Sequence, residues 1–280
     1  MWLPDFLCSS VSEICQKCGI DIQFYEIDRN LLPKYSFRMG AGDWLYLVDY
    51  FGQLTSEDIE FARGFANGNL ILDESQAYYR EPLDIDTLYT CRKWFGVADG
   101  AFLHTSDGQH LTEADIPKGF SAMHMGYVLG RYETTAAEFF ELSKSNNARF
   151  IAEGLTFMSA LTANLLKGID YDAFAYRRNA NYRYIDRELG GVNRFVPRCD
   201  QVPFMYPLLL SFDASTARKR LASEGVYIPM LWPNVLKDGH SGPQAIEYAS
   251  CMLLLPIDQR YNRGDMDRLI SLVGKVLKDE

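Results

Sequence analysis

The sequence predicts an α/β protein with a mostly parallel sheet flanked by helices, followed by a smaller C-terminal α/β domain. Two observations predict this class. Short apolar runs alternate with helix signals over residues 2–105, as they do in parallel sheets with helices on both faces. A long helical pattern then separates this part from a second stretch of alternation after residue 203. We place the domain boundary near residue 165, which gives domains of residues 1–165 and 166–280.

The first half of the chain contains strand-like runs separated by two helix signals. The capping-box pattern Ser10-Val11-Ser12-Glu13 predicts a helix that ends at Cys18, before Gly19. Thr55-Ser56-Glu57-Asp58 predicts the start of a second helix, which ends near Gly68. The expected strands are 2–8, 20–27, 44–51, 69–73 and 100–105.

The second half begins with helices and ends in a new alternation. The expected helices are 134–166, with an interruption near 145–147, then 170–189, 214–224, 242–249 and 265–277. The expected strands are 203–212, 226–231 and 251–256.

Charge and cysteine content narrow the functional class. The net charge of -9 argues against a general nucleic-acid binder, which would present a basic face. The N-terminal residues lack the basic and apolar regions of a signal peptide, and the apolar run 251–255 is too short to cross a bilayer. We therefore expect a cytoplasmic protein with no membrane partner. Cys15 and Cys18 form a CxxC without a second pair at zinc-ligand spacing, so no metal site is predicted.

Asp73 and Lys93 are the most informative residues. Asp73 ends an apolar strand-like run, and Lys93 follows twenty residues later. We predict that the two residues come close together in the fold, at the carboxyl ends of neighbouring strands. A pyridoxal-phosphate (PLP) enzyme needs a carboxylate that keeps the pyridine nitrogen protonated and a lysine that forms a Schiff base. Trp94 and Phe95 are candidates for the apolar walls that keep such a lysine neutral, although packing explains them equally well. The structural alternative is that Asp73 caps a turn and Lys93 lays its stem on aromatic rings.

Several motifs, taken in order, carry a resemblance to a known family. They are Leu3-Pro4-Asp5, Val48-Asp49-Tyr50-Phe51-Gly52, Asp73-Glu74-Ser75-Gln76, Arg92-Lys93 with Asp99-Gly100, and Arg177-Arg178 with Tyr182. Together they resemble the fold-type-I PLP-dependent aminotransferases, and within them the DegT/StrS nucleotide-sugar aminotransferases. The resemblance runs over nearly the whole chain.

This resemblance implies roles for individual residues. Lys93 would form the Schiff base with PLP and act as acid and base, Asp73 would hold the pyridine nitrogen, and Gln76 would bind the ring oxygen. Thr90 and Arg92 would bind the cofactor phosphate or a substrate anion. Arg131 would face the cleft or form a surface salt bridge, and Arg260 would bind a substrate carboxylate or tie the two domains together. The resemblance also implies a nucleotide-linked keto sugar as substrate, an amino donor, and a homodimer.

The chain also departs from the family pattern. The family's N-terminal segment, which holds the cofactor phosphate, is not matched in this sequence, so we expect PLP to bind weakly or not at all. The family's Glu-Gly-Gly has become Asp99-Gly100-Ala101, and Asn181-Tyr182-Arg183 comes too late to match the family's Asn-Tyr-Arg. The alternative function is therefore a degenerate or truncated, non-catalytic relative with a binding or assembly role.

Overall fold

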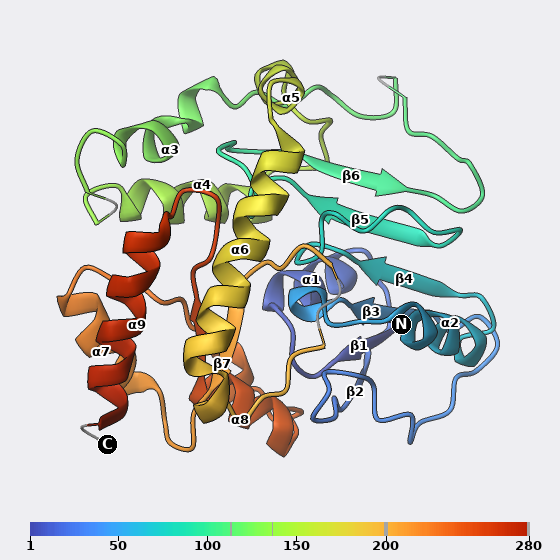
Figure 1. Ribbon diagram of the computed structural model, residues 1–280. Coiled ribbons are helices and arrows are strands. Elements are labelled where there is room, and N and C mark those ends of the chain that lie inside the picture. The colour runs from blue at the N-terminus through green and yellow to red at the C-terminus, as the bar shows by residue number, and fades with distance from the viewer. Residues whose placement is uncertain (113, 136, 199–200, 279–280) are drawn as a thin grey trace. The chain divides into compact units, whose positions relative to one another are not determined.

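The computed structural model describes residues 1–280 except 113, 136, 199–200 and 279–280 (Figure 1). The chain divides into two compact units. The first contains residues 1–80 and 171–280, and the second contains residues 81–170. The predicted division into 1–165 and 166–280 stays a prediction. In the described part of the chain, no helix is both long and apolar enough to cross a membrane.

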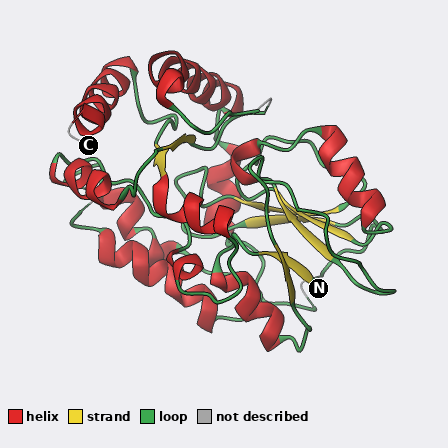
Figure 2. Cartoon of the chain, turned by 90° about the horizontal axis from the view of Figure 1, so that it is seen from below, coloured by secondary structure: helices red, strands yellow, loops and turns green. Residues whose placement is uncertain are grey.

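The first unit contains four parallel strands in the order β2-β1-β3-β4. They are β1 (Trp2–Pro4), β2 (Gln23–Tyr25), β3 (Leu45–Val48) and β4 (Leu70–Asp73). All four residues of β3 are buried, as expected for a strand covered on both faces. Strands and helices alternate along the chain. Figure 2 colours the helices red and the strands yellow. The prediction of a mostly parallel sheet flanked by helices is confirmed.

Two helices connect these strands, α1 (Ser9–Lys17) and α2 (Ser56–Phe65). The predicted capping box of α2 is present, because the Thr55 side chain accepts from the Asp58 amide and the Asp58 side chain accepts from the Thr55 amide. The capping box predicted for α1 is wrong. The N-cap is Cys8, which makes no side-chain cap bond, and Ser10 already lies inside the helix.

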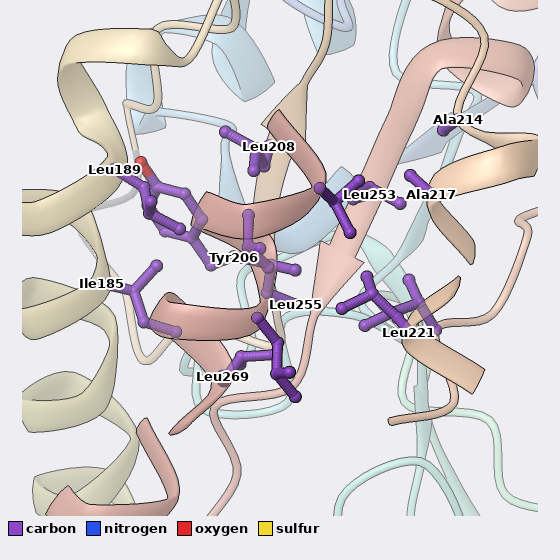
Figure 3. Packing of buried hydrophobic residues seen from close by; sticks show 14 of the residues in the cluster. Ile185, Leu189, Tyr206, Leu208, Ala214, Ala217, Leu221, Leu253, Leu255 and Leu269 are labelled. Carbon is purple, nitrogen blue, oxygen red and sulfur yellow. The ribbon is translucent and has the colours of Figure 1, made fainter. Parts of the chain in front are cut away.

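After residue 170 the chain returns to the first unit and forms a second apolar core. Strands β7 (Tyr206–Leu209) and β8 (Met252–Leu255) pair antiparallel. The helices of this part are α6 (Tyr171–Leu189), α7 (Ser215–Ser223), α8 (Pro243–Cys251) and α9 (Arg263–Lys278), with the short helices η3 (Gly190–Val192) and η4 (Pro233–Leu236). Figure 3 shows how side chains from α6, α7, α9 and both strands pack together. The strand expected at 226–231 does not form.

Polar contacts join the C-terminal part of this unit to its N-terminal part. The Gly242 amide donates to Asp5 Oδ2 at 2.7 Å, and Arg198 Nη1 lies 3.3 Å from Asp58 Oδ2. Trp232 has a left-handed backbone (φ 52°) and sets its ring 4.7 Å from that of Phe6. A bulky residue adopts this conformation only where surrounding contacts hold it.

The second unit contains an antiparallel pair, β5 (Asp86–Thr90) and β6 (Ala101–His104). Its helices are η2 (Ala122–His124), α3 (Gly126–Gly130), α4 (Phe140–Ala152) and α5 (Ala160–Lys167). Strand β5 lies outside the residue ranges that we expected to form strands. The expected helix 134–166 is interrupted after α4 and not at 145–147, because the Phe157 backbone pairs with Pro117 and Gly119 and Ser159 caps α5.

Candidate functional site

The carboxyl end of β4 fixes Asp73 in a buried polar environment. Asp73 is 8% exposed; its Oδ2 accepts from the Tyr46 hydroxyl at 2.9 Å and its Oδ1 from the Ser75 amide at 2.8 Å. Val48 is the register partner of Asp73, so Tyr46, two residues earlier, lies on the same side of β3. Each carboxylate oxygen can accept a further hydrogen bond, so Asp73 is held in place and can still bind a ligand.

Gln76 lies on the segment that follows Asp73 and supports a strained backbone. Its Oε1 accepts from the Phe51 amide at 3.1 Å, and Phe51 has a left-handed backbone (φ 59°). Among the described residues, Gln76 Nε2 has no hydrogen-bond partner. The side chain is therefore oriented through one atom and offers the other to a ligand.

A buried ionic group lies next to Asp73 in the sequence and in space. Asp49 and Glu74 have fully buried side chains, and Arg80 Nη2 lies 2.9 Å from Asp49 Oδ2. Arg80 Nε lies 2.9 Å from Glu74 Oε1, an ion pair without hydrogen-bond geometry. Burial and the nearby Asp49 carboxylate hold the pKa of Glu74 well above its ordinary value. Two carboxyl groups thus share one arginine, and the raised pKa of Glu74 favours its protonated form.

Lys93 lies in the second unit, in the loop between β5 and β6. The Cys91 amide bonds to the Gly100 carbonyl at 3.0 Å, which closes this loop. Trp94 and Phe95 are buried, whereas Lys93 is exposed. Asp73 and Lys93 thus lie in different units, and their predicted proximity stays a prediction, as does the phosphate role of Thr90 at the end of β5.

Asp99 and Gly100 close the same loop against α5. Asp99 accepts from the Ser159 amide at 2.7 Å and from the hydroxyls of Ser159 and Thr162. Burial alone would raise the pKa of Asp99, but these hydrogen bonds lower it. Gly100 has φ +105°, and a Cβ there would lie 2.8 Å from Thr162. The Asp-Gly pair of the predicted motif therefore has a structural role in shaping the loop that carries Lys93.

The three predicted substrate arginines have different environments. Arg260 pairs with Asp258 through two bonds of 2.7 Å, so a substrate carboxylate would have to displace this partner. Arg92 Nη1 donates to Asn147 Oδ1 at 2.7 Å, and burial lowers the pKa of its guanidinium. Arg131 has a buried Nε without a hydrogen-bond partner in the described part of the chain. Their substrate roles stay predictions.

Solved structures of known proteins share this architecture. The sugar aminotransferase CalS13 from Micromonospora echinospora superimposes with a TM-score of 0.65 over 98% of this chain and 80% of its own, at 14% identity. The aminotransferase TlmJ from Streptoalloteichus hindustanus gives a TM-score of 0.65 over 99% of this chain and 79% of its own, at 16% identity. The chain has the fold of these sugar aminotransferases.

An enzyme with a different reaction shares the fold too. The GDP-4-keto-6-deoxy-D-mannose-3-dehydratase of E. coli, solved with bound hydrated PLP, gives a TM-score of 0.66 at 15% identity, over 97% of this chain and 79% of its own. No protein-family model and no curated protein matches the sequence. The fold expected from the motif resemblance is confirmed by the architecture that these solved structures share with the chain.

The sequence analysis missed Tyr46 as the partner of Asp73. The alternation along Leu45–Val48 is hidden because every residue of the strand is apolar or aromatic. The register of β3 against β4 is what brings the Tyr46 hydroxyl to Asp73. The available signal was a tyrosine in the strand expected before the one that ends at Asp73, since its hydroxyl can donate to a carboxylate.

Proposed function

We propose that this protein is a PLP-dependent aminotransferase that acts on a keto sugar, carried on a nucleotide, with an amino donor as the second substrate. The observation that carries the proposal is the buried Asp73 carboxylate at the end of β4, held by Tyr46 and Ser75. It occurs in a fold shared with sugar aminotransferases, at the strand end where parallel α/β sheets bind ligands.

The residues around β4 fit a pyridine ring. Asp73 has the acceptor capacity to bind a protonated ring nitrogen, and its fixed geometry keeps the carboxylate oriented. Gln76 Nε2 is a donor suited to the ring oxygen, while Oε1 stays with Phe51. When bound, PLP supplies an electron sink for the substrate's amino carbon.

Lys93 is the proposed residue for the covalent attachment and for proton transfer at the substrate carbon. The proposal requires that the exposed Lys93 be covered when the site is assembled, since a Schiff-base lysine needs a neutral amine. We propose that the second subunit of a homodimer, the commonest symmetric oligomer, covers Lys93.

The test is spectroscopic and uses the full chain with excess PLP. We expect a yellow absorbance band that borohydride abolishes, and a reduced cofactor adduct on the peptide that contains Lys93. Lys93→Ala should remove the band, whereas Lys144→Ala, which changes an exposed lysine of the same unit, should retain it. Absence of the band in the wild type, or its persistence in Lys93→Ala, would overturn the proposal in favour of a non-catalytic binding role.

A further inference from the structure

Two arginines of the second unit share one aromatic ring. The guanidinium carbon of Arg92 lies 4.2 Å from the centroid of the Phe150 ring, and that of Arg149 lies 4.3 Å from it. The ring attracts each cation, but the two cations also repel each other. Such an arrangement is favourable when an anion completes it.

Two asparagines of α4 hold these arginines in place. Arg92 Nη1 donates to Asn147 Oδ1 at 2.7 Å, and Arg149 Nε donates to Asn146 Oδ1 at 2.9 Å. Asn146 is buried and in turn donates to the Ala98 carbonyl at 3.0 Å and to the Tyr127 hydroxyl at 3.3 Å. The two asparagines are neutral, so these bonds orient the guanidinium groups without balancing their charges.

A third arginine belongs to the same cluster. Arg131 lies one helical turn after Tyr127, at the end of α3, which places both on one side of the helix. The charges of Arg92, Arg131 and Arg149 all act on the Tyr127 hydroxyl. The guanidinium groups of Arg92, Arg131 and Arg149 therefore all lie within electrostatic reach of the Tyr127 hydroxyl.

This arginine cluster has unused donors and excess positive charge. Arg131 Nε and Arg149 Nη2 are buried, and neither has a hydrogen-bond partner within the described residues. Glu153 pairs with Arg149 at 2.7 Å, and its side chain is 46% exposed. Asp99 also acts on Arg92, but its oxygens accept hydrogen bonds from α5. A buried charged donor without a hydrogen-bond partner lowers the stability of the folded protein, and a bound anion would supply that partner.

We propose that the arginine cluster binds a phosphate group of a ligand. Two guanidinium groups on one ring, with a third cation nearby, match the multiple oxygens and the double charge of a phosphate better than those of a single carboxylate. As a subsite of the proposed active site, it rests on the proposed function, but anion binding can be measured without it. The phosphate belongs either to the cofactor or to a nucleotide-linked substrate, which share this chemistry.

The first experiment titrates the full chain with inorganic pyrophosphate in a calorimeter at low salt. We expect saturable binding that Arg131→Gln and Arg149→Gln each weaken roughly tenfold or more. Arg149→Lys keeps the positive charge but loses the paired N–H donors of the guanidinium group, so it should also weaken binding. Arg187→Gln, at an exposed arginine paired with Glu188, is the matched control and should leave affinity unchanged. Circular dichroism confirms that each variant is folded.

Absence of pyrophosphate binding by the wild type, or equal affinity in Arg131→Gln and Arg187→Gln, would overturn the inference. A second titration uses protein whose cofactor adduct has been reduced by borohydride. Loss of pyrophosphate binding there assigns the cluster to the cofactor phosphate, and retained binding assigns it to the substrate. Pyrophosphate binding by a protein that never develops the yellow band would support the anion site and defeat only the proposed function.

Discussion

Two charged clusters in this molecule have an excess of opposite charges. In the first unit, Asp49 and Glu74 share the single cation Arg80, and the carboxyl side chains are fully buried. In the second unit, the arginine cluster has more cations than facing carboxylates and two buried N–H groups without partners. Burial raises the pKa of both carboxyl groups, so the carboxyl cluster can lower its negative charge by taking up a proton. Guanidinium groups keep their protons, so the arginine cluster needs an anion from outside.

This difference separates a structural cluster from a binding cluster. A carboxyl pair that protonates is complete inside the protein and leaves nothing for a ligand. Arginine side chains cannot lose their charge in this way, so the arginine cluster can still bind an anion. Substitutions that remove one cation from each cluster should therefore have unlike effects, and the predictions below run from the largest to the smallest.

Arg80→Met should destabilise the protein by about 3–5 kcal/mol, because it leaves Asp49 and Glu74 buried without their cation. Urea unfolding measures the change. Arg63→Met, at a half-buried arginine 3.9 Å from Glu60, is the control and should change stability by less than about 1 kcal/mol. Similar losses in both variants would show that the buried cluster does not depend on Arg80.

Asp73→Asn tests the carboxylate beside this cluster. Asparagine keeps the size of the side chain but loses the charge that holds a protonated ring nitrogen. Loss of a charged hydrogen bond, about 1.5–3 kcal/mol, should lower amino transfer about 10- to 100-fold with little change in folding stability. Steady-state kinetics with urea unfolding alongside separates the two effects. Full activity in the variant would remove Asp73 from the site.

Glu74→Gln tests whether the carboxyl cluster holds a proton. Because the pKa of Glu74 is raised in the folded state, its stabilisation is present below the ordinary value of 4.5 and is lost as pH rises through the folded pKa. Glutamine imitates the protonated acid at every pH. The stability of the wild type relative to Glu74→Gln should therefore fall with rising pH, by at most about 1.4 kcal/mol per pH unit. A difference independent of pH between 5 and 8 would contradict proton uptake by Glu74.

Arg131→Met makes in the arginine cluster the same change as Arg80→Met makes in the carboxyl cluster. It should be neutral or stabilising within about 1 kcal/mol in the absence of phosphate, because a buried donor without a partner is removed. Added pyrophosphate should raise the thermal midpoint of the wild type more than that of the variant. A loss as large as that of Arg80→Met would make Arg131 a structural residue.

Local sequence signals predicted many of the elements. The capping box at Thr55 and Asp58 predicts the start of α2, and the apolar run before Asp73 predicts β4. In α9 the buried residues recur at helical spacing: Met266, Leu269, Leu272, Val273 and Val276. These signals depend on neighbours in the chain, so periodicity and capping rules are sufficient to find them.

The errors occur where distant contacts decide the local structure. Residues 226–231 have strand composition but no partner strand, and β5 becomes a strand through its pairing with β6. The backbone of Phe157 pairs with Pro117 and Gly119, which ends the helical pattern between α4 and α5. Strand pairing is a property of two segments, and one segment alone does not reveal it.

By itself, the sequence determined the alternation of strands and helices, the end of a strand at Asp73, and the motif order that resembles sugar aminotransferases. Tertiary structure alone decided that Tyr46 meets Asp73, that Asp49 and Glu74 share Arg80, and that Arg92 lies on the same Phe150 ring as Arg149. Periodicity depends on residues that are neighbours in the chain. The charge balance of a buried cluster depends instead on strand register and helix packing, because these bring together residues that no local pattern connects.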